Sequence, residues 1–68
     1  MDEDHLNLEI RRFLKKVGVT SQRLIENQIY NAEKKGLVRI GDKIELEVKL
    51  VIKKFDSEST IDGQLTIN

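Results

Sequence analysis

The sequence predicts an α+β fold in which two N-terminal helices pack on one face of a small antiparallel β-hairpin or three-stranded sheet. Apolar residues recur every three or four positions up to Gly36, which is helical spacing, and alternate with polar residues later, which is strand spacing. Sixty-eight residues suffice for one domain only. The predicted domain spans residues 1–68, with helices at about 2–17 and 21–35 and strands at about 43–54 and 59–67.

The first predicted helix has one apolar face. Asp2 is a suitable N-cap, because its carboxylate can accept a hydrogen bond from a backbone N–H of the first turn. Gly18 fits the left-handed residue that closes a helix. The apolar face consists of Leu6, Ile10, Phe13, Leu14 and Val17.

A short corner, "VGVTSQ", is predicted to separate this helix from a second one. Thr20 or Ser21 supplies the second N-cap, and Gly36 closes the second helix after two lysines. No internal repeat is evident along the chain. The apolar stripe of the second helix consists of Leu24, Ile25, Ile29 and Ala32.

Strict alternation in the second half predicts two strands with one half-buried face. Pairing Ile52 with Ile61 keeps the apolar residues of both strands on that face and places the turn at Asp56-Ser57. Segment Leu37–Ile40 is either a third strand or only a connection.

Gly63 occupies an inward position of the second strand, where a side chain is normally found. In the predicted register it lies opposite Leu50. A glycine there weakens a strand unless another group approaches closely. We therefore expect Phe13 of the first helix to pack over Gly63.

The stretches "MDEDHLNLEIRRFLKKVGVTSQRLIE" and "STIDGQLTI" resemble a family of very small bacterial proteins of unknown function. Its members have an acidic N-terminal tip, a "FLKKVGVTSQ" helix–turn–helix corner and a C-terminal β segment containing "IDG". The resemblance covers most of the chain and is closest over residues 1–26. It implies a helix–helix–β architecture and a bacterial origin, and it carries over no activity or site residue.

Composition argues against several classes of function. Twelve basic and twelve acidic side chains cancel, so the charge excess of a nucleic-acid or membrane-surface binder is missing. There is no cysteine and only one histidine, His5, which leaves no Cys/His catalytic pair and no His/Cys metal set. We therefore predict no enzymatic activity, cofactor, metal or small-molecule ligand. No apolar run approaches the roughly 20 residues of a membrane span, and a cytoplasmic protein is expected.

Two functions fit the sequence. The preferred hypothesis is a small non-catalytic interaction or regulatory module that binds a protein partner or a second copy of itself, since a core this small rarely supplies more than about 3–5 kcal/mol. The alternative is helix-turn-helix or winged-helix-like nucleic-acid binding through the corner. Glu26 and Glu33, on the outward face of the second helix, would repel phosphate, which makes nucleic acid the less favoured partner.

The candidate partner surface has two parts. One is the outward, largely basic face of the helices. The other is the strand Thr60–Ile67, which is the free edge if Leu37–Ile40 pairs with the strand Ile44–Ile52. It carries one charge and no proline or lysine, and so lacks the usual protection against edge pairing. The residues assigned to this surface are Leu8, Arg11, Arg12, Lys15, Tyr30, Asp62 and Gln64.

Overall fold

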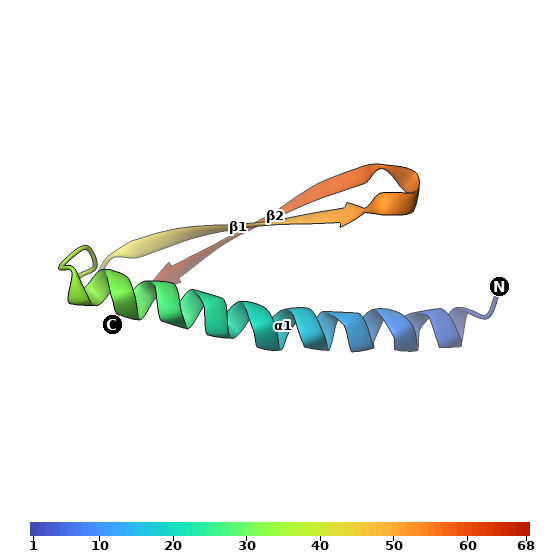
Figure 1. Cartoon of the computed structure of the whole chain (residues 1–68), viewed down its shortest axis with the longest axis horizontal. Helices are drawn as coiled ribbons and strands as arrows, with labels where there is room; N and C mark the ends of the chain where they lie inside the picture. Colours follow the sequence, from blue (N-terminus) through green and yellow to red (C-terminus); the bar gives the residue numbers. More distant parts are fainter. The chain divides into compact units, whose positions relative to one another are not determined.

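The computed structural model describes residues Met1–Asn68 and contains one helix and one β-hairpin (Figure 1). The chain forms two units, Met1–Lys35 and Gly36–Asn68. The α+β class is confirmed, and the packing of the two units into a single domain stays a prediction. The elements are α1 (Glu3–Lys34), β1 (Lys43–Ile52), the short 3-10 helix η1 (Lys53–Phe55) and β2 (Ser57–Thr66).

α1 is a single helix of 32 residues, so the predicted division into two helices is wrong (Figure 1). Gly18 lies in its interior and does not have the positive φ of a closing residue. A glycine inside a helix costs about 1 kcal/mol relative to alanine, which weakens the helix without ending it. Thr20 and Ser21 are helical residues of α1 instead of caps.

The two apolar stripes predicted for separate helices form one stripe in α1, because several positions carry the same type of residue eleven positions later. Eleven residues make three helical turns with only a small remainder. The stripe therefore crosses Gly18 without changing direction, and a turn at that point is unnecessary. The expected corner conceals this repeat in the sequence. The repeated pairs are Leu6 and Val17, Leu8 and Val19, Arg12 and Arg23, Phe13 and Leu24, and Leu14 and Ile25.

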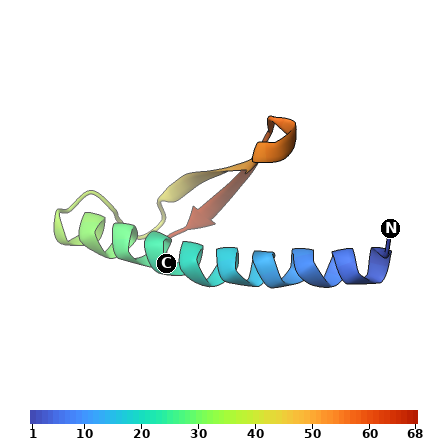
Figure 2. The ribbon, with the colours of Figure 1, turned by 45° about the vertical axis from the view of Figure 1, so that its right-hand side comes forward.

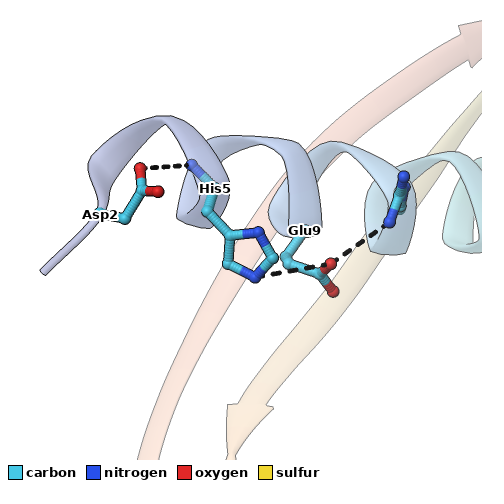
Figure 3. Close-up of polar contacts among 4 residues, drawn as sticks. Asp2, His5 and Glu9 are labelled. Carbon is cyan, nitrogen blue, oxygen red and sulfur yellow. Dashed lines mark hydrogen bonds and ion pairs between the residues drawn. The ribbon is translucent and has the colours of Figure 1, made fainter.

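α1 begins after Asp2 and ends before Gly36, as predicted. The Asp2 carboxylate accepts a hydrogen bond from the His5 backbone N–H at 3.1 Å, which confirms Asp2 as the N-cap (Figure 3). At the other end the Lys35 N–H donates to the carbonyl groups of Asn31 and Ala32. Gly36 follows with a φ of 73°, the left-handed conformation that closes a helix.

β1 and β2 form a twisted antiparallel ribbon of two strands (Figures 1 and 2). The predicted strands differ from the observed ones by about two residues, but the predicted register is wrong. Ile52 lies opposite Ser57, and Ile61 lies opposite Val48. The shift of four residues is an even number, so the apolar residues of both strands still share one face.

The loop explains the change of register. A two-residue turn at Asp56-Ser57 would require a positive φ at one or both positions, which favours glycine. The observed loop is longer and contains the 3-10 turn Lys53–Phe55, followed by Asp56 at φ 56°. Only one residue is then left-handed, and aspartate tolerates that conformation better than most residues.

The segment Leu37–Ile40 is a connection and not a third strand. It runs into a turn in which the Asp42 N–H donates to the Arg39 carbonyl at 3.1 Å and the Asp42 carboxylate accepts from the Arg39 N–H at 2.9 Å. Gly41 supplies the positive φ, 97°, that the third position of a type II turn requires. The sheet therefore has two strands, and the outer edge of β1 is not covered by this segment.

The predicted cross-strand neighbour of Gly63 is wrong. Gly63 lies opposite Leu46 instead of Leu50. Within the hairpin, a Cβ atom added to Gly63 has no atom within 4 Å. The packing of Phe13 over Gly63 stays a prediction.

Replacing Gly18 with alanine should raise the free energy of unfolding by about 0.5–1 kcal/mol, because alanine loses less conformational entropy in a helix. An added Cβ at Gly18 has no atom within 4 Å and no left-handed backbone to strain. Urea unfolding followed by circular dichroism measures the change. Gly36→Ala is the matched control and should destabilise the protein, because its φ is 73°. A loss of helicity in Gly18→Ala would restore the predicted corner.

Replacing Gly63 with valine should stabilise the hairpin, by up to about 1 kcal/mol, because valine favours strands and would contact Leu46 across the ladder. The control Gly41→Val should destabilise it, since Gly41 has a φ of 97°. Thermal unfolding of the two variants beside the parent protein provides the comparison. A lower midpoint for Gly63→Val would show that the inner face is closely covered at this position.

Candidate interaction surfaces

The outward face of α1 carries an apolar row that the two-helix interpretation divides. Leu8, Val19 and Tyr30 are spaced eleven residues apart, so they follow one line along the helix, with about 16 Å between successive members. Their exposed fractions are 46%, 49% and 56%. Sequence reasoning missed Val19, because it was assigned to the corner; the signal was its spacing from Leu8 and Tyr30.

Basic side chains of the candidate surface lie between the first two members of this row. Arg12 is four residues after Leu8, and Lys15 is four residues before Val19, so both share its side of the helix. Arg11 lies beside the row. All three basic residues are exposed.

No helix of the structure combines the length and the apolar character needed to cross a membrane.

The polar contacts near the start of α1 are local and exposed (Figure 3). A Glu9 carboxylate oxygen lies 3.9 Å from His5 Nε2 and 3.4 Å from an Arg12 guanidinium nitrogen. More than half of each side chain is accessible to water. Ion pairs this exposed contribute about 0–1 kcal/mol. His5 is therefore a surface residue, with Glu9 as its only ionic neighbour.

The outward face of the hairpin brings acidic groups together. Asp62 lies opposite Glu47, and Gln64 lies opposite Glu45. Two carboxylates directly opposite each other destabilise a strand pair. No three His, Cys, Asp or Glu side chains are arranged to hold a metal ion.

The inward face of the hairpin is apolar but not enclosed. Val48 and Ile61 are cross-strand neighbours on this face, and 45% and 58% of their surfaces remain exposed. None of the residues on this face is buried. The apolar residues that share it are Ile44, Leu46, Val48, Leu50, Ile52, Ile61 and Leu65.

One amphipathic helix followed by one antiparallel hairpin defines a small α+β protein. The chain belongs to DUF6494, a family of unknown function whose model matches residues 1–68. This match confirms the resemblance seen in the sequence to a family of uncharacterised small proteins, and it assigns no activity. No curated protein and no solved structure matches the chain.

The continuity of α1 removes the corner on which the helix-turn-helix alternative depends. Because the protein has a formal net charge of zero, we expect it to bind duplex DNA weakly and without sequence preference in a titration at low salt. Each phosphate contact adds about 0.9 to the slope of log K against log salt, so a shallow slope is expected. Submicromolar, sequence-selective binding with a steep slope would contradict this expectation and identify nucleic acid as the partner.

Proposed function

We propose that this protein is a small non-catalytic interaction module whose fold is completed by association, with a second copy of itself as the partner. The observation that carries the proposal is the lack of an enclosed core: none of the 68 residues is buried. Large apolar side chains remain open to water in both units. Phe13 and Leu24 of α1 are 57% and 61% exposed, and Ile61 of β2 is 58% exposed.

Neither unit has a source of stability of its own. An isolated two-stranded hairpin is marginal in water, and a helix in a protein takes most of its stability from packing its apolar face. Small domains compensate with disulfides, metals or oligomerisation. The chain contains no cysteine, and its carboxylates and histidine form no metal cluster. Association therefore provides the most direct means of burying the apolar faces.

The outward residues supply a second contact region. The row formed by Leu8, Val19 and Tyr30 stands apart from the main apolar stripe, with Arg12 and Lys15 in between. Exposed aromatic and arginine residues are typical of protein interfaces. Once the main stripe is covered, this row remains available to a further protein.

The proposal predicts that stability depends on protein concentration. Association by the folded state raises the unfolding midpoint as concentration rises, because the bound state is favoured by mass action. Thermal unfolding across a hundred-fold concentration series, with the molar mass measured by light scattering, tests this directly. The expected result is a rising midpoint and a mass above that of one 7.9 kDa chain.

A cooperative monomer with a concentration-independent midpoint would overturn the proposal, since it would show that the two units bury their apolar faces against each other. A chain that neither unfolds cooperatively nor self-associates would overturn the choice of a second copy as partner.

A further inference from the structure

We propose that β1 pairs with β1 of a second copy, antiparallel and about a two-fold axis at Val48, to form a four-stranded sheet in the order β2–β1–β1–β2. The inference rests on the proposed function and names the surface through which it operates. The edge of β1 is free because Leu37–Ile40, for which the sequence leaves both a third strand and a connection open, is a connection.

The hydrogen bonds at the base of the hairpin show which groups of β1 face this edge. Ile67 donates to the Asp42 carbonyl and accepts from the Gly41 N–H, so the N–H and C=O of Ile67 both point toward the β1 side. These directions alternate along a strand. With Ile44 opposite Leu65, the even-numbered residues of β1 face β2. The odd-numbered residues Glu45, Glu47, Lys49 and Val51 therefore offer their backbone groups at the free edge.

The sequence of β1 is self-complementary about Val48. A two-fold axis opposes each residue with its mirror position, because residue i contacts j and j contacts i. Inward residues then pair Ile44 with Ile52 and Leu46 with Leu50, so every inward pair is aliphatic. On the outward face Glu47 lies opposite Lys49 of the second copy, twice. Cross-strand pairs of opposite charge and of branched side chains stabilise sheets.

Neighbouring registers are less favourable. An axis at Leu50 pairs only residues 48–52 of β1 and contains no Glu–Lys pair, whereas the axis at Val48 pairs residues 44–52. The other neighbouring axes oppose like charges. An axis at Glu47 opposes two carboxylates, and an axis at Lys49 opposes two ammonium groups. An axis at Leu46 opposes Glu45 with Glu47 and Lys43 with Lys49. Each of these arrangements places like charges directly opposite each other, which destabilises the pair. Odd shifts turn the apolar residues of one copy to the wrong face.

The composition of the two strands also favours β1 as the central one. Five aliphatic residues of β1 face inward, whereas β2 contributes Ser57, Ser59 and Gly63 to the same face. A central strand has a neighbouring strand along each of its edges, whereas an edge strand has a neighbour along one edge only. The more polar β2 therefore suits the edge position of the sheet. The edge of β2, proposed from the sequence through Asp62 and Gln64, is the competing site.

Proline substitutions compare the two edges. Glu47→Pro removes an N–H at the free edge of β1 and no hydrogen bond to β2, whereas Gln64→Pro makes the same change at the free edge of β2. In sedimentation equilibrium, Glu47→Pro should raise the dissociation constant about ten-fold or more, and Gln64→Pro should leave it unchanged. The reverse result, or an equal effect of both variants, would overturn the β1 assignment while the proposed self-association stands.

Charge exchange tests the register independently of proline. Glu47→Lys should weaken the dimer, because two lysines then face each other, yet it should stabilise the hairpin by relieving the contact between Glu47 and Asp62. Lys49→Glu should weaken the dimer similarly, and the double variant should restore it. The weakening should be larger at low salt, where exposed charges are less screened. Failure of the double variant to recover association would reject the axis at Val48.

Discussion

Burial of apolar surface is the constraint on which the rest of this molecule depends. α1 and the hairpin each form a single layer with one apolar face, and a single layer cannot cover itself. With no buried residue among 68 and no cysteine for a covalent cross-link, the free energy of folding has to come from contact between such faces. Under the proposed function, folding and association are linked.

The continuity of α1 has consequences for both sides of the helix. On one side it joins two apolar stripes into one that passes Gly18, and this long stripe is the larger surface that requires a cover. On the other side it aligns Leu8, Val19 and Tyr30, which a corner would have pointed in different directions. The same eleven-residue spacing produces both features.

The hairpin shows how a loop decides which edge is accessible. The four-residue loop with left-handed Asp56 sets the register of the two strands. The register in turn sets which backbone N–H and C=O groups of β1 point to its free edge. The turn at Arg39–Asp42 then leads the chain into β1 without adding a third strand. The result is a two-stranded ribbon with two free edges, of which that of β1 has the self-complementary order of side chains.

Local patterns in the sequence by themselves determined the helical first half, the two strands, the N-cap at Asp2 and the closure at Gly36, because each depends on residues close in the chain. Alternation also determined which strand residues share a face. Only the structure decided that the helix continues through Gly18, which register the strands take, and that Leu37–Ile40 is a connection and not a strand. A lone glycine is compatible with either a helix interior or a helix end. Its destabilising effect on a helix, a few tenths to about 1 kcal/mol relative to alanine, is outweighed by an apolar stripe that continues in phase. Registers that differ by an even number place the same residues inward, so only the geometry of the loop distinguishes them.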